Sequence, residues 1–366
     1  MFKSPFSSLN PPPLPVGEGI GATADIVGAA GAGEDRSFLF SFELRACWGI
    51  IFLEREFNPT PRTTAIINIT PNNKISVWSF QLKAVSKTGV ETRYVSNTNE
   101  TALSLCITAA KKLDFNSHDI GACIFVSQSP DYILPTSACI AQEELGLDRD
   151  VAAFDINLGC SGFIYGLSIA KGVLSDIEKS KALLLCGDTY SKYINKNDRT
   201  CRPIFSDAGS AVLLSKSENK NNFTFNFGTD GRGYDKLIVR NRASKIESKF
   251  DDCLHMNGAD VLLFTMSNVP SGVKALLKKA NLESEDIDYF LFHQASAVVL
   301  DDIQRKLNIP DAKFPRNNKH FGNTVSATIP ILMKDLEDQG KLKKGQKLLL
   351  FGFGVGYSYG GCIFEY

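Results

Sequence analysis

Short apolar runs alternate with amphipathic segments from about residue 63 to the end of the chain. Before residue 220 we expect strands at 65–69, 122–126, 151–156, 182–186 and 211–214, and helices at 101–113, 138–145 and 163–174. After it we expect helices at 258–277, 297–307 and 324–339, and strands at 289–292, 348–351 and 362–366. This alternation favours an α/β fold with helices covering the sheets, and the two series predict similar halves at 61–220 and 221–366.

Residues 1–60 have a different composition. Gly, Ala and Pro dominate the first part, as in Pro11-Pro-Pro13, so we expect a disordered or non-core extension. Its most apolar stretch, 37–53, contains Glu43 and Arg45. Since a membrane span needs roughly 18 to 20 uninterrupted apolar residues, we expect no span. One proline further on, Pro270, is expected to bend or split the helix at 258–277.

Charge and cysteine content exclude several classes. The 40 basic and 40 acidic residues of the 366-residue chain balance, so no global field draws in nucleic acid. The nine cysteines contain no Cys-x-x-Cys pair, which argues against a metal site. An odd cysteine count on a large core also argues against a disulfide framework, so we expect a cytoplasmic protein.

The segment Asp155-Ile-Asn-Leu-Gly-Cys160-Ser-Gly-Phe163 carries the clearest chemical signal. A buried-type strand enters a Gly-flanked turn, and an apolar helix follows. A thiol at a helix N-terminus meets the positive end of the helix dipole, which favours the reactive thiolate. The sequence therefore predicts that Cys160 is a nucleophile.

Two polar residues are candidate partners. His293 directly follows the apolar run Tyr289–Phe292, and Asn323 lies in Gly322-Asn-Thr-Val325 before a helix. Each alone is explained as a structural residue, a capped His or a turn Asn. However, Cys160 and His293 both follow strands, and chemistry in open α/β sheets collects beyond the C-terminal strand ends.

A Cys, His and Asn in that order fit two classes of enzyme. In papain-like peptidases the His follows the Cys by about 130 to 150 residues, as His293 follows Cys160 here. The peptidase pattern Cys-Gly-Ser/Ala-Cys-Trp/Tyr near the mature N-terminus is missing. The other class forms carbon–carbon bonds on thioesters.

The motifs around these residues resemble β-ketoacyl-ACP synthase III, of the thiolase superfamily, from about residue 60 to the C-terminus. The resemblance rests on the Cys160 segment, His293-Gln-Ala-Ser296, Gly322-Asn-Thr-Val-Ser-Ala327, Gly352-Phe-Gly-Val-Gly356, Thr88-Gly-Val-Glu-Thr-Arg93 and Phe205-Ser-Asp-Ala-Gly209. It implies a thiolase-like fold with two similar βαβ-rich halves in a five-layered α-β-α-β-α arrangement.

The resemblance implies a decarboxylating Claisen condensation in fatty acid or related lipid or polyketide biosynthesis. Cys160 would hold the acyl group, while His293 and Asn323 would donate hydrogen bonds to the malonyl thioester oxygen. Backbone N–H groups of Cys160 and of the loop formed by Gly354, Val355 and Gly356 would hold the acyl oxyanion. The substrates would be acyl-CoA or acyl-ACP and malonyl-ACP, with no cofactor and no metal.

The resemblance also implies outer contacts. Arg199 would stack on the coenzyme A adenine, and a dimer partner would insert Leu134 into the acyl pocket of a homodimer. Ser296 and Phe205 would contact substrate. Arg305 and Lys306 would dock the acyl carrier protein.

The sequence departs from the family at several of these places. Lys83 stands where the family often has a tryptophan beside the adenine, and Val298 and Leu263 replace basic docking residues. Val355 replaces the middle glycine of the closing loop, where a positive φ would be strained. Acyl transfer to an oxygen or nitrogen nucleophile, and a non-catalytic partner subunit, therefore stay open as alternatives.

Overall fold

The computed structural model describes residues 41–43, 48–49, 74–76, 87–217 and 223–366. The chain divides into two units, Met1–Phe38 and Leu39–Tyr366, and every described residue lies in the second. The strand expected at 65–69 and most of the expected extension at 1–60 lie outside the described residues. Within 1–60, two short strands, β1 (Ser41–Glu43) and β2 (Trp48–Gly49), pair with a strand of the first sheet.

The first sheet has the strand order β1-β8-β7-β5-β6, with β2 also paired to β8. Its long members are β5 (Ile120–Val126), β6 (Ala152–Ile156), β7 (Lys181–Asp188) and β8 (Ala208–Ser217). Strand β5 runs parallel to β6 and β7, and β8 runs antiparallel to β7. Strands β5 and β7 are buried almost throughout, whereas the edge strand β6 is only half-buried.

The second sheet has the order β12-β13-β14-β9. Its strands are β12 (Tyr289–Phe292), β13 (Lys347–Gly354), β14 (Ser358–Glu365) and β9 (Thr224–Thr229). As in the first sheet, a parallel pair, β12 and β13, lies beside antiparallel neighbours. Cys160 follows β6, which is parallel to β5, and His293 follows β12, which is parallel to β13. Each residue therefore lies beyond the C-terminal end of a parallel strand of its own sheet.

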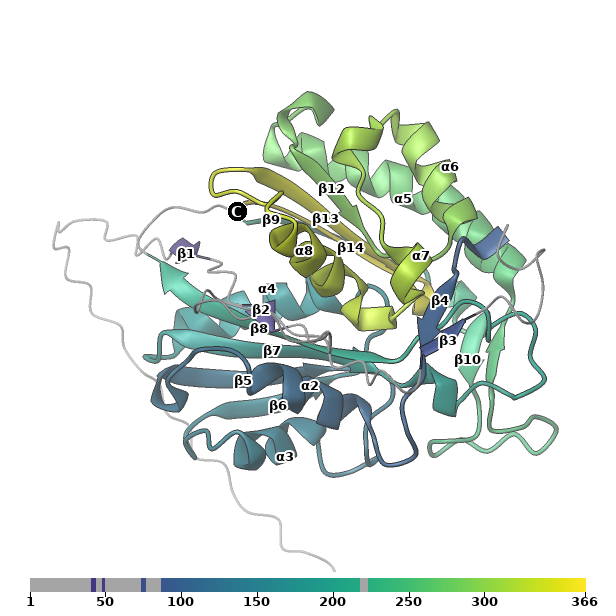
Figure 1. Ribbon diagram of the computed structural model, residues 1–366, viewed down its shortest axis with the longest axis horizontal. Coiled ribbons are helices and arrows are strands. Elements are labelled where there is room, and N and C mark those ends of the chain that lie inside the picture. Colours follow the sequence, from purple (N-terminus) through teal and green to yellow (C-terminus); the bar gives the residue numbers. More distant parts are fainter. Residues whose placement is uncertain (1–40, 44–47, 50–73, 77–86, 218–222) are drawn as a thin grey trace, which may run out of the picture. The chain divides into compact units, whose positions relative to one another are not determined.

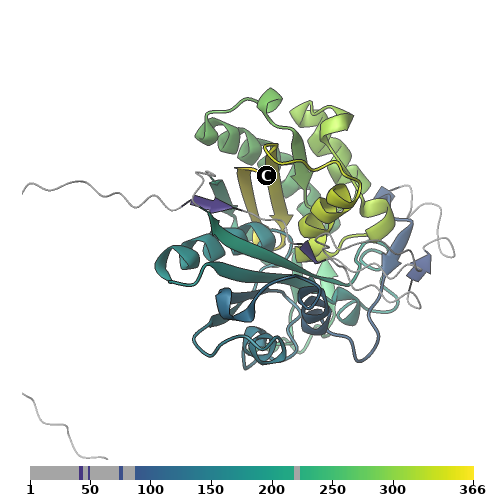
Figure 2. The same ribbon diagram turned by 60° about the vertical axis from the view of Figure 1, so that its left-hand side comes forward.

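Helices pack on both faces of each sheet (Figures 1 and 2). Helices α4 (Gly162–Asp176) and α8 (Thr328–Asp338) contact strands of both sheets. Helices α2 (Ala102–Ala110) and α3 (Ser137–Glu144) pack on the first sheet, while α5 (Gly258–Ala280) packs on the second sheet and on α6 (Ala297–Leu307). The largest buried cluster joins α4 and α8 to both sheets through side chains such as Phe163, Leu184, Leu332 and Leu350.

Shorter elements complete the described chain. Strands β3 (Lys74–Ser76) and β4 (Thr92–Tyr94) form one hairpin-like pair, and β10 (Leu237–Val239) and β11 (Leu254–Met256) form another. Helix α7 covers Asn318–Phe321. Short 3-10 helices occur at Ser117–Asp119, Tyr190–Lys192, Gly231–Gly233, Ser284–Asp286, Asp311–Lys313, Val325–Ala327 and Val355–Tyr357. Within the described ranges, no helix combines the length and apolar character needed to cross a membrane.

Pro270 does not split helix α5, which runs unbroken from Gly258 to Ala280. Proline lacks an N–H, so the carbonyl of Met266, one turn earlier, loses its helical donor. The Lys306 ammonium group of α6 donates to that carbonyl at 2.8 Å. A side chain from a neighbouring helix thus replaces the missing hydrogen bond and helps the helix continue.

Candidate active site

Cys160 lies on the turn between the end of β6 and the start of α4 and is only 5% exposed. The C-terminal end of β13, in the second sheet, packs closely against this turn. A Cβ built on Gly354 would lie 2.9 Å from the Cys160 Sγ, so only glycine permits this approach. The buried thiol therefore sits where the two sheets meet.

Burial controls the acidity of this thiol. Burial, together with the nearby Asp188 carboxylate, raises the pKa of Cys160 to about 12, although hydrogen bonds from the backbone of Val355 and of Cys160 itself oppose the rise. The helix terminus was expected to favour a resting thiolate, but burial is the largest influence on this thiol and favours the protonated form. The resting form is a thiol held beside two backbone donors.

His293 follows β12 and is 1% exposed. Burial lowers the pKa of His293 to about 3, against a hydrogen bond with the Val325 backbone, so the ring is neutral at working pH. Its Nδ1 lies 2.7 Å from the Thr328 hydroxyl oxygen, which in turn lies 3.2 Å from the Val325 carbonyl oxygen. When Thr328 donates its proton to Nδ1, the ring proton sits on Nε2.

Asn323 is fixed through both its backbone and its side chain. Its N–H donates to the Ile204 carbonyl at 2.9 Å, and its carbonyl accepts from the Ser206 N–H at 2.8 Å. Its Oδ1 accepts from the Val325 N–H at 2.9 Å, which leaves the Nδ2 hydrogens for other partners. The preceding Gly322 has φ of 67°, and a Cβ there would lie 2.5 Å from the Ser206 Oγ.

One small, largely apolar pocket of about 120 Å³ brings the three predicted catalytic residues together. It also contains Phe205, Ser296 and Gly354, which the sequence analysis singled out. The lining consists of Cys160, Ile204, Phe205, Leu237, Met256, Gly258, Val261, Leu262, Thr265, His293, Ala295, Ser296, Val299, Asn323, Phe353 and Gly354.

A larger pocket of about 740 Å³ shares the Leu237 wall with this site. Val355, which follows Gly354, belongs to its lining. The remaining lining is rich in tyrosine and comprises Gln128, Pro130, Asp131, Tyr132, Ile133, Asn157, Tyr190, Tyr193, Tyr234, Ile238, Val239, Arg242, Ala243 and Leu254. It offers space that the 120 Å³ pocket lacks.

Two predicted substrate residues, Arg199 and Leu134, line neither pocket. Arg199 is exposed, and the Leu134 side chain is 80% exposed. Gly356 is also absent from both linings and lies in the turn after Gly354.

Arg305 and Lys306, the predicted carrier-docking residues, lie on α6 and both make contacts within the protein. The Arg305 guanidinium lies 2.5 Å, and the Lys306 ammonium 3.2 Å, from the Asp302 carboxylate. Lys306 also donates to the Met266 carbonyl described above. The two residues that replace family basic residues, Leu263 and Val298, are exposed apolar side chains.

Val355 does not have the strained backbone that its position suggested. The positive φ angles of the closing loop belong to Gly354 and Gly356, at 156° and 112°. The strain instead falls on Val325, whose φ is 55°.

Three polar residues around the site escaped the sequence analysis: Thr328, Ser326 and Asp188. Asp188 is fully buried at the end of β7 and accepts hydrogen bonds from the Ser326 N–H and hydroxyl. A charged residue closing the apolar run 182–187 was a usable signal, because an unpaired charge seldom ends a buried strand without a role. Ser326 and Thr328 carry no comparable signal.

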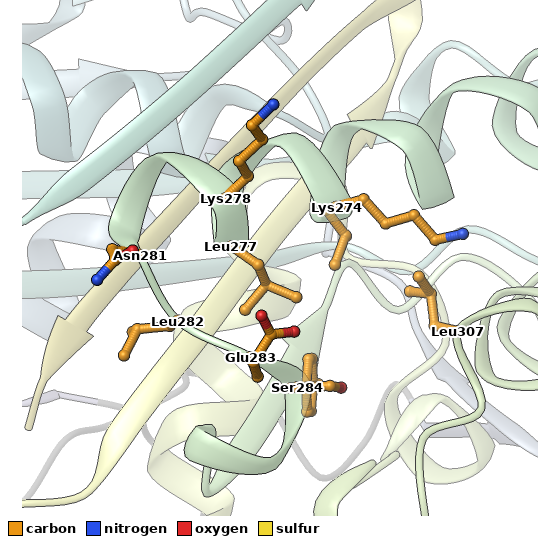
Figure 3. A pocket seen from close by; sticks show the side chains of 10 residues that line it. Lys274, Leu277, Lys278, Asn281, Leu282, Glu283, Ser284 and Leu307 are labelled. Carbon is orange, nitrogen blue, oxygen red and sulfur yellow. The ribbon is translucent and has the colours of Figure 1, made fainter.

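A separate pocket of about 470 Å³ lies at the C-terminal end of α5 and contains none of the three predicted catalytic residues (Figure 3). Its labelled side chains are Lys274, Leu277, Lys278, Asn281, Leu282, Glu283, Ser284 and Leu307. Across the part of the chain that the structure describes, no group of three or more His, Cys, Asp or Glu side chains is placed to hold a metal ion.

Two family models match the chain. "3-Oxoacyl-[acyl-carrier-protein (ACP)] synthase III" matches residues 154–231, which include Cys160. The model of the C-terminal part of the same enzyme matches residues 277–366, which include His293 and Asn323.

Whole proteins and solved structures agree with these models. The chain is 33% identical over 291 residues to the β-ketoacyl-[acyl-carrier-protein] synthase III of Clostridium perfringens, covering 76% of this chain and 89% of that protein. It is 31% identical to β-ketoacyl-[acyl-carrier-protein] synthase III 2 of Bacillus anthracis, over 84% and 99% of the two chains. A crystal structure of a 3-oxoacyl-(acyl-carrier-protein) synthase III superposes with a TM-score of 0.78 at 36% identity, over 82% of this chain and 97% of that one.

Proposed function

The chain belongs to the β-ketoacyl-[acyl-carrier-protein] synthase III family, and we propose that Cys160, His293 and Asn323 carry out its decarboxylating condensation. The enzyme is an acyltransferase of fatty acid biosynthesis that joins an acyl thioester to malonyl-ACP. The observation that carries the assignment of residues is the shared, buried pocket in which the three side chains meet.

The first half-reaction moves the acyl group to Cys160. The sulfur attacks the thioester carbonyl, and the carrier thiol leaves. The proton that Cys160 loses goes to the departing thiol, so the exchange needs no net proton. Because the N–H groups of Val355 and Cys160 already lie at the sulfur, they support stabilisation of the oxyanion that forms beside it.

The second half-reaction begins with malonyl thioester. Loss of carbon dioxide leaves an enolate whose negative charge gathers on the thioester oxygen. Neutral His293, through Nε2–H in the tautomer whose Nδ1 accepts from Thr328, and the Asn323 amide group would donate hydrogen bonds to that oxygen. Neither donor bears a charge, so neither gives up its proton to the enolate.

The enolate carbon then attacks the acyl carbonyl on Cys160. The carbon–sulfur bond to the enzyme breaks, and the β-ketoacyl thioester departs on the carrier. Cys160 leaves as thiolate and takes up one proton, which its high pKa favours. The cycle consumes one malonyl carboxylate and one proton and releases one carbon dioxide.

We place the carried acyl chain in the tyrosine-rich pocket behind Leu237, since the catalytic pocket is too small for it. Ser296 and Phe205, in the catalytic pocket, are placed to contact the phosphopantetheine arm. Arg199 remains a proposed contact for coenzyme A. Arg305 remains a proposed carrier contact, although its guanidinium is partly neutralised by Asp302.

We propose a homodimer in which the edge strand β6 and the loop holding Leu134 meet a second copy. The half-buried edge of β6 and the exposed Tyr132, Ile133 and Leu134 support this assignment. Light scattering should give twice the chain mass for wild type and a lower mass for Leu134→Asp. A wild-type monomer would contradict the dimer.

We further propose that the two sheets and their helices form five layers, α-β-α-β-α. The contacts of α4 and α8 with both sheets, and of α2, α3 and α5 with one sheet each, support this arrangement. The halves 61–220 and 221–366 would each supply one sheet.

The assignment of Cys160 is tested by mass spectrometry of products. Wild-type enzyme with acyl-CoA or acyl-ACP should gain one acyl group at Cys160 and, after malonyl-ACP is added, should form β-ketoacyl-ACP. Cys160→Ala should do neither. An adduct without carbon dioxide release would indicate acyl transfer to another nucleophile, and absence of any adduct would favour a non-catalytic subunit.

A further inference from the structure

Asp188 is a buried carboxylate that the mechanism above does not use. The groups that stabilise its charge are neutral hydrogen-bond donors. Its Oδ1 accepts from the Gln128 N–H at 2.8 Å and from the Ser127 hydroxyl at 3.3 Å. Its Oδ2 accepts from the Ser326 N–H at 3.2 Å and from the Ser326 hydroxyl at 2.6 Å. The carboxylate therefore joins the segment after β5 to the segment that carries Asn323.

Val325, the residue before Ser326, has a backbone conformation that β-branched residues rarely adopt. Its φ of 55° lies in the left-handed region, where the branched side chain crowds the backbone. It is fully buried against the Cys160 turn, where a Cβ built on Gly159 would meet the Val325 Cγ1 at 3.2 Å. Such a conformation persists only where neighbouring groups hold it.

This conformation orients both proposed donors of the decarboxylation site. The Val325 N–H donates to the Asn323 Oδ1 at 2.9 Å, which turns the amide nitrogen toward other partners. The Val325 carbonyl lies 3.2 Å from the Thr328 hydroxyl oxygen, which lies 2.7 Å from the His293 Nδ1. A rotation of the Val325 backbone would therefore disturb Asn323 and His293 together.

Anchors stand on both sides of Val325. On one side, the Asn323 backbone is held by Ile204 and Ser206. On the other side, Ser326 is held by Asp188 through two hydrogen bonds. We propose that Asp188 is a positioning residue for decarboxylation, because through Ser326 it keeps Val325 left-handed and so aims His293 and Asn323. This inference rests on the proposed roles of those two residues.

The first test is Asp188→Asn, which keeps the shape but replaces one acceptor oxygen with an NH₂ donor. Two rates are measured with the full chain: acylation of Cys160 by intact mass, and carbon dioxide release from malonyl-ACP by the acylated enzyme. We expect carbon dioxide release to fall on the order of a hundredfold, as for a misplaced catalytic group. Acylation should not fall, since it does not use His293 or Asn323 and since loss of the Asp188 charge lowers the pKa of Cys160.

The second test compares two residues at position 325 in the Asp188→Asn background. Val325→Gly should restore much of the carbon dioxide release, because glycine adopts positive φ without steric cost. Val325→Ala removes nearly the same side chain but keeps a Cβ, so it should restore little. The pair separates relief of backbone strain from loss of side-chain volume.

Equal losses in both rates for Asp188→Asn, or equal rescue by Gly and Ala, would overturn the inference. If Asp188→Asn does not fold, Ser326→Ala takes its place, since it removes only the shorter of the two contacts. The variant Asn323→Ala distinguishes failure of the proposed role of Asp188 from failure of the proposed function itself. If Asn323→Ala abolishes carbon dioxide release while Asp188→Asn leaves it unchanged, only the role of Asp188 fails. If Asn323→Ala has no effect, the proposed function fails.

Discussion

Cys160 combines a buried thiol with backbone donors that become useful only when negative charge develops beside the sulfur. Its pKa of about 12 means that the thiol form dominates at neutral pH. A helix-end position alone is thus a poor guide to thiol acidity, because burial acts in the opposite direction and is the largest influence on this thiol.

The acidity of Cys160 predicts a slow and steeply pH-dependent alkylation. The rate of iodoacetamide addition at Cys160 should rise about tenfold per pH unit from neutral to mildly alkaline pH, because only the thiolate reacts. Intact mass and peptide mapping would follow the reaction, with Cys160→Ala to subtract the other thiols. A rate that levels off by neutral pH would show a stable thiolate instead.

His293 predicts a pH dependence of stability. Its folded pKa of about 3 lies below the ordinary value of 6.5. Between these values the unfolded chain binds a proton that the folded chain does not, so this contribution to stability is complete above about pH 6.5 and falls by about 1.4 kcal/mol per unit as pH decreases.

Urea unfolding at several pH values, compared between wild type and His293→Gln, measures this contribution. The wild type should lose stability more steeply on acidification than the variant does. Identical slopes would mean that His293 is not buried as a neutral ring. Comparing the two proteins cancels the contributions of other titrating groups, including Asp188, whose raised pKa of about 6 acts in the opposite direction.

At the scale of elements, helix α5 depends on a residue from its neighbour. Lys306 was expected to serve carrier docking, yet its ammonium group replaces the hydrogen bond that Pro270 cannot make to the Met266 carbonyl. The local sequence therefore predicted a break that a contact between helices prevents.

This contact predicts a coupling between Lys306 and Pro270. Lys306→Met should destabilise the protein by about 1 to 2 kcal/mol, because it leaves a carbonyl without its charged donor. With Pro270→Ala, which restores the helical N–H, the same change should cost less. A double-mutant cycle from urea unfolding measures the difference. Strict additivity, together with weaker binding of the carrier by Lys306→Met, would instead favour a docking role alone.

Elements with long apolar runs were predictable, and short or polar ones were not. The buried strands at 122–126, 182–186 and 348–351 lie inside β5, β7 and β13. Strand β9 and the pair β10–β11 were missed, since β9 carries a mixed pattern and β10 and β11 are three residues each. Such strands are held by pairing with a neighbouring strand, which the sequence of a single segment does not reveal.

At the scale of the whole molecule, the motifs identified the reacting groups but not what holds them. Cys160, His293 and Asn323 were found because each stands in a recognisable local pattern. Thr328 and Asp188 act through hydrogen bonds between segments far apart in sequence, and Val325 acts through a backbone conformation that those segments hold. Their importance depends on tertiary geometry, which residue spacing does not encode.

The central claim is that three residues of one pocket have two separate roles: Cys160 holds the acyl group, and His293 and Asn323 stabilise the enolate. The most direct measurement is carbon dioxide release from malonyl-ACP by enzyme already acylated at Cys160, for wild type, His293→Ala and Asn323→Ala. We expect all three to acylate, and each variant to release carbon dioxide at least about a hundredfold more slowly than wild type. Release at the wild-type rate by either variant, or an acyl group mapped to another cysteine, would contradict the account.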